Sequence, residues 1–135
     1  MEFRKISVQS VLALEQAIAD LARQPGNSLA VMPDVFVFNN RERIVSLTAH
    51  HRLPAIYPFR YFAEIGGLIA YGIDNLDMYR RAAAYADRIM RGASPTSLPV
   101  EAPKKFELVI NLKAARSLGL DVPPTLLASA DQVIE

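Results

Sequence analysis

The sequence predicts an α/β domain of three layers, in which a mostly parallel sheet of about five strands is flanked by helices. Short apolar runs alternate along the chain with segments whose apolar residues recur every three or four positions. The apolar runs contain few polar residues, which is typical of strands buried in a parallel sheet. This alternation favours βαβ units with right-handed crossovers. At 135 residues, the length fits a single domain.

The first half of the chain is predicted to contain three extended segments and two helices. The elements are an extended segment with Phe3, Ile6 and Val8, a helix over residues 11–23 capped by Ser10, a strand over 29–32, a second helix that Asn39 or Asn40 caps and His50-His51 ends, and a strand over 53–56. Pro25-Gly26-Asn27 breaks the first helix, and Pro33-Asp34 ends the strand before the second.

The second half is predicted to contain two more strands and a long helix. The elements are a short helix or turn over residues 58–65, a strand over 68–71, a helix that begins at Asp74 and ends at Arg91, a strand over 106–112, one or two helical turns over 113–118, and a last helix from Thr125. Gly92 should end the long helix as a left-handed residue. Residues 93–105 are rich in proline and read as a surface connection.

The composition limits the possible functions. The formal net charge of +1 points to no polyanionic partner, so nucleic acid is not expected. The chain has no cysteine, which excludes disulfides, thiolate catalysis and zinc sites with sulfur ligands. No run of residues is long and apolar enough to span a membrane. The start, MEFRKISVQ, does not resemble a signal peptide, so we expect a cytoplasmic chain or an export signal outside it.

Aromatic side chains and one arginine follow the strand over residues 53–56. They are Tyr57, Phe59, Arg60 and Tyr61, and Tyr71-Gly72 ends the next strand. In open α/β sheets, ligands bind beyond the carboxyl ends of the strands. Rings with a few polar groups suit a small organic ligand better than they suit catalysis. The predicted ligand-binding residues are Pro33, Asp34, Tyr57, Pro58, Arg60, Tyr71 and Gly72.

No catalytic, metal or cofactor site is predicted. Asp34 directly follows a strand, as the phosphoacceptor aspartate of a signalling receiver domain does. Such a site also needs an acidic pair after the first strand to hold magnesium, and the first extended segment has none, so Asp34 is expected to face a ligand or to cap a helix. His50 and His51 are adjacent and point to different sides of a helix, so they cannot chelate one metal together. Gly66-Gly67 precedes a strand and not a helix, so it is no phosphate cradle. We therefore expect no enzyme.

Several blocks resemble the substrate-binding proteins of ABC transporters, in the family linked to tryptophan and tyrosine uptake. The blocks are HRLPAIYPFRYF, GGLIAYG, YRRAAAYADRIMRGASPTSLPVE, KFELVINLKAARSLGL and PPTLLASADQVIE. The resemblance covers about residues 3 to 135 and corresponds to the C-terminal half of such proteins. It implies one lobe of a type I periplasmic binding protein, which holds a solute in a cleft between two lobes and delivers it to a permease.

The resemblance also implies positions for some residues. Pro33-Asp34 and Tyr57-Pro58 would lie on loops that face the cleft, and Tyr71-Gly72 near the hinge. Members of the family are periplasmic or lipid-anchored outside the cytoplasm. They are about twice as long, with an export signal and an N-terminal lobe that this sequence lacks.

The long helix has a consequence for association. In members of the family, the chain crosses back into the N-terminal lobe after the GGLIAYG segment. The helix from Asp74 to Arg91 would therefore pack against that lobe. Without that lobe its apolar stripe is uncovered, and exposed apolar patches promote association. We therefore expect a homodimer, and exchange of this helix between copies is one way to form it.

Three functions stay open at this point. The chain is a solute-binding component of an ABC importer, with an aromatic amino acid or related solute and a permease as partners. It is a cytoplasmic ligand-sensing module without a transporter. Or it is a truncated fragment that folds but binds nothing.

Overall fold

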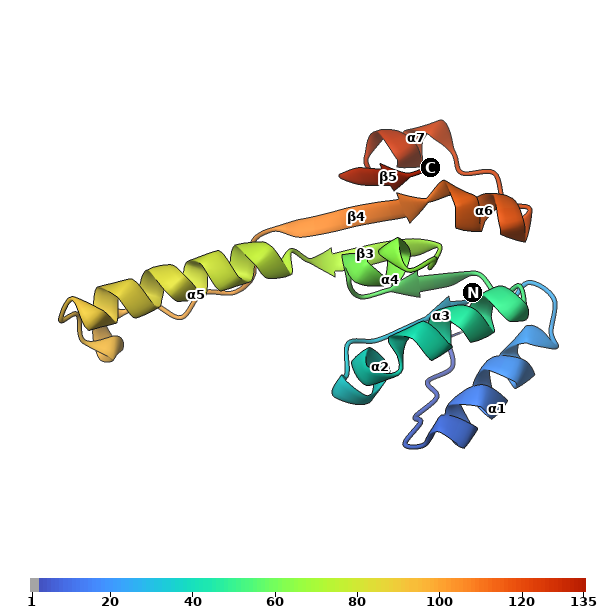
Figure 1. The fold of residues 1–135 in the computed structure, drawn as a ribbon, viewed down its shortest axis with the longest axis horizontal. Coiled ribbons are helices and arrows are strands. Elements are labelled where there is room, and N and C mark those ends of the chain that lie inside the picture. Colours follow the sequence, from blue (N-terminus) through green and yellow to red (C-terminus); the bar gives the residue numbers. More distant parts are fainter. Residues whose placement is uncertain (1–2) are drawn as a thin grey trace.

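The computed structural model describes residues 3–135 and shows a five-stranded sheet flanked by helices (Figure 1). The strands lie in the order β1 (Leu29–Ala30), β2 (Ala55–Tyr57), β3 (Ile69–Ile73), β4 (Phe106–Asn111) and β5 (Gln132–Ile134). β1, β2 and β3 are parallel, β4 is antiparallel to β3, and β5 is parallel to β4. The predicted α/β class with a mostly parallel sheet is confirmed.

The strands alternate with seven α-helices in the described residues. These are α1 (Val11–Ala22), α2 (Val35–Asn39), α3 (Arg41–His50), α4 (Arg60–Glu64), α5 (Asn75–Met90), α6 (Leu112–Leu118) and α7 (Pro124–Ala128), and a 3₁₀ turn, η1 (Pro95–Ser97), follows α5. Within residues 3–135, no helix combines the length and the apolar character needed to cross a membrane.

Side-chain caps explain where several helices begin. Ser10 Oγ accepts a hydrogen bond from the backbone N–H of Ala13 at 3.2 Å, so the predicted cap of α1 is confirmed. Asp74 caps α5 in the same way, through the N–H of Asp77. Asp77 also lies in the first turn of α5, where the helix dipole favours a negative charge.

The core lies between one face of the sheet and the layer formed by α1, α3 and α4. Phe62 and Ala63 of α4 are fully buried, and Ile44 of α3 is 1% exposed. α1 packs against α3 and adds Leu14 and Ile18 to the same cluster. From the sheet, this cluster takes Ala55, Tyr57, Ala70 and Val109, and Leu53, just before β2, also belongs to it. This face of the sheet is named the inner face.

The sheet contains a different first and last strand from those predicted. Residues 3–8 form no strand, although Val8 packs against the core. β5, which was not predicted, occupies the other edge and follows α7. The strand predicted over residues 29–32 is only two residues long and is not buried on both faces, because Ala30 and Met32 are exposed. β1 is at the edge of the sheet, where a strand has a neighbour on one side only and is less covered by the rest of the domain. An apolar run at this position therefore need not be buried.

The helix α2 was also missed. Pro33-Asp34 was expected to end a strand, and the side chain of Asp34 takes one of its two expected roles: it caps α2 by accepting a hydrogen bond from the N–H of Phe36. Asn40, predicted as a cap, makes no side-chain cap bond to α3 and donates instead to the carbonyl of Phe36. The run VFVFN therefore forms a helical turn because Asp34 supplies its first hydrogen bond.

The helix α5 projects from the body of the molecule as an arm (Figure 1). It continues outward from β3, and residues 91–105 return along it to β4. The Tyr85 hydroxyl donates to the carbonyl of Pro99 at 2.8 Å, and Arg81 forms ion pairs with Asp77 and Glu101. These contacts hold the proline-rich connection against one side of α5.

Candidate ligand-binding site

The predicted site residues lie at one edge of the sheet. Because β1, β2 and β3 are parallel, their carboxyl ends meet at the same edge, and the antiparallel β4 and its parallel neighbour β5 begin there. This edge, named the carboxyl rim, contains Pro33-Asp34, residues 58–60, residues 71–74, residues 105–107 and residues 131–132. The topology thus gathers six of the seven predicted residues in one region, although they come from three separate segments, and Tyr57 lies directly before it.

Asp34 and Pro33 occupy the β1 end of the carboxyl rim, and both are exposed. One carboxylate oxygen of Asp34 accepts the N–H of Phe36 at 2.7 Å, which fixes the side chain at the start of α2. Asp34 therefore has a structural role as a cap and still presents a negative charge to solvent at the rim.

Tyr57 does not face the rim, contrary to the expectation. Its side chain is 2% exposed, and its ring stacks on Phe62 with ring centroids 5.1 Å apart. Its hydroxyl makes a 2.7 Å hydrogen bond with the Thr48 hydroxyl. Burial raises the pKa of Tyr57, and the hydrogen bond to Thr48 partly opposes that rise. Because Tyr57 is on the inner face of β2, its ring points into the core. The ring therefore packs beneath the rim and does not reach the solvent-exposed surface there.

Pro58 and Gly72 are brought into direct contact at the rim. A Cβ atom added to Gly72 would lie 1.9 Å from the carbonyl oxygen of Pro58, a distance that no side chain can accommodate. Glycine is therefore required for the loop after β2 to lie against β3. The neighbouring Tyr71 is 55% exposed and stacks on Phe106 with ring centroids 6.0 Å apart.

Arg60 is the centre of a hydrogen-bonded cluster at the rim. Its Nε donates to Glu64 at 3.0 Å and one terminal nitrogen donates to Glu107 at 3.1 Å. The other terminal nitrogen donates to the amide oxygen of Gln132. The hydrogen bond to Glu64, and then the charge of Glu107, raise the pKa of Arg60. Three of the five guanidinium N–H groups are used in this way, which leaves two for a ligand.

Four charged or polar rim residues were not predicted. Glu107 and Gln132 contact Arg60, and Lys105 Nζ pairs with the Asp74 carboxylate at 2.8 Å. The Lys105 hydrogen bond lowers the pKa of Asp74, and the N–H of Asp77 lowers it further. The pKa of Lys105 is raised by the same pair. The pairing of β4 with β3 brings Lys105 and Glu107 to the rim, the pairing of β5 with β4 brings Gln132, and Asp74 directly follows β3.

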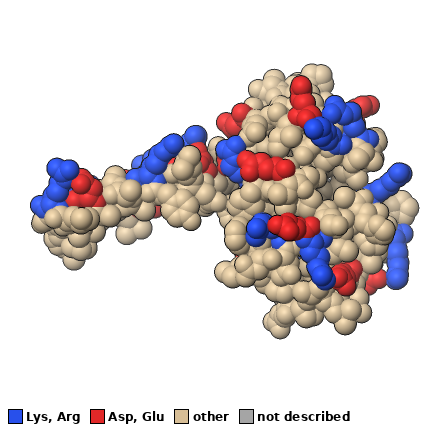
Figure 2. Space-filling view, viewed as in Figure 1, with Lys and Arg blue, Asp and Glu red and all other residues tan. Residues whose placement is uncertain are grey.

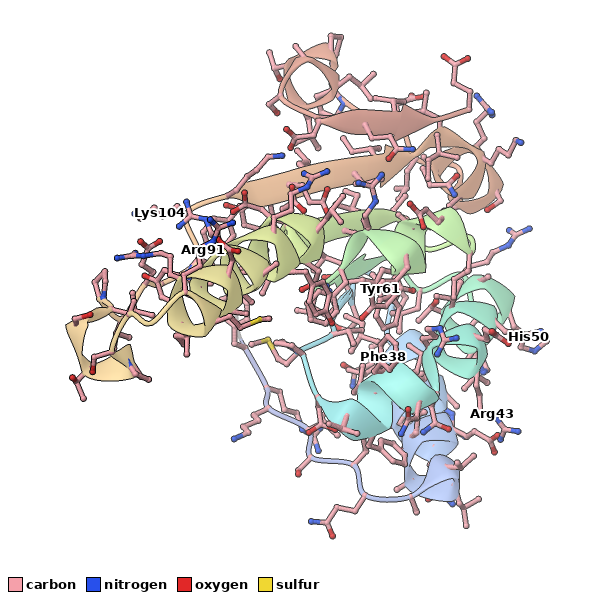
Figure 3. The ribbon with its side chains drawn as sticks, turned by 60° about the vertical axis from the view of Figure 1, so that its left-hand side comes forward. Phe38, Arg43, His50, Tyr61, Arg91 and Lys104 are labelled. Carbon is pink, nitrogen blue, oxygen red and sulfur yellow. The ribbon has the colours of Figure 1, made fainter. Side chains whose placement is uncertain are left out.

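An aromatic cluster supports the β2 side of the rim. Tyr61 meets Phe38 edge to face at 5.2 Å, and Figure 3 shows these two rings pointing toward each other from α4 and α2. Tyr61 also stacks on Phe59 and on Phe62. Burial raises the pKa of Tyr61 to about 12. The cluster joins the segments after β1 and after β2, so it fixes their positions relative to each other.

Charges and hollows elsewhere on the described surface do not suggest another site. Acidic and basic side chains are interspersed on the face shown in Figure 2. Two hollows among residues 3–135 lie away from the rim: a cavity of about 20 Å³ that includes Thr48 and Ala114, and an open hollow of about 360 Å³ between residues 4–6 and α1. Within the same residues, no three acidic or histidine side chains are placed to hold a metal ion.

Replacement of Glu107 by glutamine should make stability less sensitive to pH. Burial raises the pKa of Glu107 in the folded state, although Arg60 lowers it. A carboxyl group with a raised folded pKa stabilises the fold at low pH, and this stabilisation is lost as the pH rises through the folded value. Thermal melts of both proteins from about pH 4.5 to pH 7 should therefore show Glu107→Gln gaining melting temperature relative to the original chain as the pH rises. A constant difference across this range would contradict the prediction.

The fold and the rim define the class of the protein: an α/β lobe in which the carboxyl ends of the parallel strands meet at one rim. The chain matches the model of one family, ABC transporter substrate binding protein, over residues 1–134. It therefore belongs to the family of ABC transporter substrate-binding proteins, as the sequence blocks indicated.

Solved structures support this assignment. An ABC domain in complex with L-Trp from Streptococcus pneumonia is 25% identical to this chain, with a TM-score of 0.83, and the match covers 96% of this chain and 43% of that one. A conserved domain protein from Vibrio cholerae O1 biovar El Tor strain N16961 is also 25% identical, with a TM-score of 0.79 and coverages of 90% and 41%.

A third structure shows the same fold. It is a ligand-free, open form of a substrate binding protein with adhesive properties from Clostridium difficile, 19% identical, with a TM-score of 0.64 and coverages of 94% and 42%. The chain thus spans about two fifths of the length of these structures. A comparison with curated proteins gave no match.

Proposed function

We propose that this chain is the C-terminal lobe of the solute-binding component of an ABC import system and that it contributes no catalysis. The observation that carries the proposal is the convergence of Asp34, Arg60 and Tyr71 on one rim of the sheet. The family match and the structural likeness to a domain in complex with L-Trp support a solute-binding role. A permease that receives the solute belongs to the same proposal.

The solute class that fits the rim best is an aromatic amino acid or a close relative. Arg60 has two N–H groups free for a carboxylate. Glu107 and Asp74 at the same rim, together with the exposed Asp34, supply negative charge that would favour an ammonium group. These charges suit the carboxylate and the ammonium group of an amino acid, and the likeness to a domain in complex with L-Trp favours an aromatic one.

Calorimetric titration of the chain with L-tryptophan and L-tyrosine tests this proposal. We expect weak binding, because a single lobe covers only one side of the ligand. Arg60→Ala should weaken binding about tenfold or more, since a hydrogen bond to a charged group contributes about 1.5–3 kcal/mol. Arg43→Ala is the matched control, because Arg43 is a half-exposed arginine that pairs with Glu15 on α1, away from the rim.

Two results would contradict the proposal. A folded chain that gives no heat with either amino acid would favour a fragment that binds nothing. Equal loss of affinity in Arg43→Ala and Arg60→Ala would show that the rim is not the binding site. A sensing module without a transporter would bind as expected but would have no permease encoded beside it. The homodimer expected from the long helix also remains a proposal, which the exposure of Leu76, Tyr79 and Met90 on α5 supports.

A further inference from the structure

Arg60 is held by side chains from three elements of the fold. Glu64 belongs to α4, like Arg60 itself, and accepts a hydrogen bond from Nε at 3.0 Å. Glu107 comes from β4 and Gln132 from β5, and each accepts a hydrogen bond from one terminal nitrogen of Arg60. Each of the three guanidinium nitrogens therefore has a protein partner.

The register of the sheet brings the two strand partners to Arg60. Val109 of β4 belongs to the core on the inner face, so Glu107, two residues earlier, points to the same side. Gln132 of β5 pairs with Val109, and Ile134 of the same strand packs against the core. Gln132 consequently lies on the inner face as well, next to the beginning of α4.

The close approach of the loop after β2 completes this arrangement. Gly72 in β3 is directly opposite Glu107 in β4, and the carbonyl of Pro58 fills the space that a side chain at position 72 would need. The loop can therefore lie against the sheet, and Arg60 follows Pro58 by two residues. The orientation of the guanidinium thus depends on strand pairing and not on α4 alone.

The short strand that carries Gln132 is itself fixed at its start. The N–H of Asp131 donates to the carbonyl of Leu108 at 2.9 Å, and the Asp131 carboxylate accepts the N–H of Leu108 at 2.8 Å. Both hydrogen bonds lie directly before Gln132, which is half-buried. The amide of Gln132 therefore has a defined position although β5 is at the edge of the sheet.

The helix α4 does not need Arg60 in order to stay on the sheet. Phe62 and Ala63 are fully buried, and the side-chain amide of Asn111 donates to the carbonyl of Ala63 at 2.9 Å. The side chain of Arg60, in contrast, is 45% exposed, and exposed ion pairs contribute little to stability. Three partners on a half-exposed arginine are therefore explained better by orientation of its guanidinium than by attachment of α4.

We propose that Gln132 is a positioning residue for solute binding: together with Glu107, it holds the guanidinium of Arg60 in the orientation that receives the solute carboxylate. This inference rests on the proposed function. A guanidinium binds a carboxylate through N–H groups in a fixed plane, so its orientation sets the strength of the contact. An arginine that is already restrained also loses less side-chain entropy when the ligand binds. Because Gln132 is uncharged, it restrains Arg60 without offsetting its charge.

Gln132→Leu tests the proposal, because it removes the amide acceptor with little change in size and no change in charge. In calorimetric titrations, the affinity for L-tryptophan should fall about threefold to tenfold, as expected for the loss of one hydrogen bond. The affinity for tryptamine, which has the same ring and an ammonium group but no carboxylate, should not change. Gln16→Leu is the matched control, since Gln16 is exposed on α1, away from the rim. It should alter neither affinity.

A structural role for Gln132 would weaken both ligands equally, and that result would overturn the proposal. An unchanged affinity of Gln132→Leu for L-tryptophan would overturn it as well.

A second measurement reports on Arg60 without any ligand. Exchange of the Arg60 Nε–H proton with solvent can be followed by NMR, with the signal assigned by its absence in Arg60→Ala. Exchange should be faster in Gln132→Leu than in the original chain or in Gln16→Leu. An unchanged rate would show that Gln132 does not restrain Arg60 and would overturn this inference alone. Failure of the original chain to bind L-tryptophan would instead contradict the proposed function on which the inference rests.

Discussion

Phe62→Ala is expected to lower the free energy of unfolding by about 3–5 kcal/mol, the usual cost of removing a buried phenylalanine ring. Phe62 is 0% exposed and lies between the rings of Tyr57 and Tyr61, with centroid separations of 5.1 and 5.2 Å. Its removal leaves a cavity beneath α4 and takes away the stacking partner of both tyrosines. Urea denaturation followed by circular dichroism measures this change.

Phe3→Ala provides the control for the same substitution. Phe3 is 82% exposed, so the loss of its ring should change the free energy of unfolding by less than about 0.5 kcal/mol, as is usual at the surface. If both variants lost the same stability, Phe62 would not be the centre of the core described here.

Gly72→Ala is expected to be nearly as destabilising, by about 3 kcal/mol or more, at the upper end of the effects of overpacking. The new methyl group would lie 1.9 Å from the Pro58 carbonyl oxygen, and both neighbours are backbone, so neither can rotate away. β3 or the loop after β2 has to shift, and that loop carries Arg60. We therefore expect loss of amino acid binding together with the loss of stability, measured by denaturation and calorimetry.

Ser46→Thr is the control for the addition of one methyl group. Ser46 is exposed on α3, away from the rim, so stability and binding should stay close to those of the original chain. A Gly72→Ala protein as stable as this control would show that the close approach of Pro58 to β3 is not a requirement of the fold.

The sequence predicted most of the fold because local signals agree with the final structure. The caps Ser10 and Asp74, the break at residues 25–27 and the apolar runs of β2, β3 and β4 all appear at or near their predicted positions. The exceptions lie at the two edges of the sheet. Residues 3–8 have an extended pattern but no strand partner, and β5 is a three-residue segment that becomes a strand only because β4 lies beside it. Pairing decides these cases, and it is not a local property.

The candidate site was predicted in part for the same reason. Parallel strands brought Asp34, Pro58, Arg60, Tyr71 and Gly72 to one rim, as their positions after strands suggested. Tyr57 was placed wrongly, because a residue at the end of a strand faces inward or outward according to register. Glu107 and Gln132 were missed because β4 and β5 begin at the rim, 47 and 72 positions from Arg60.

The sequence by itself determined the α/β class, the helix caps and the segments that supply the rim, since these follow from residue type and spacing over a few positions. Only the tertiary structure decided which partners hold Arg60 and which way the ring of Tyr57 points. Those features depend on contacts between residues far apart in the chain. No local pattern specifies such contacts, because they arise only when the whole sheet has assembled.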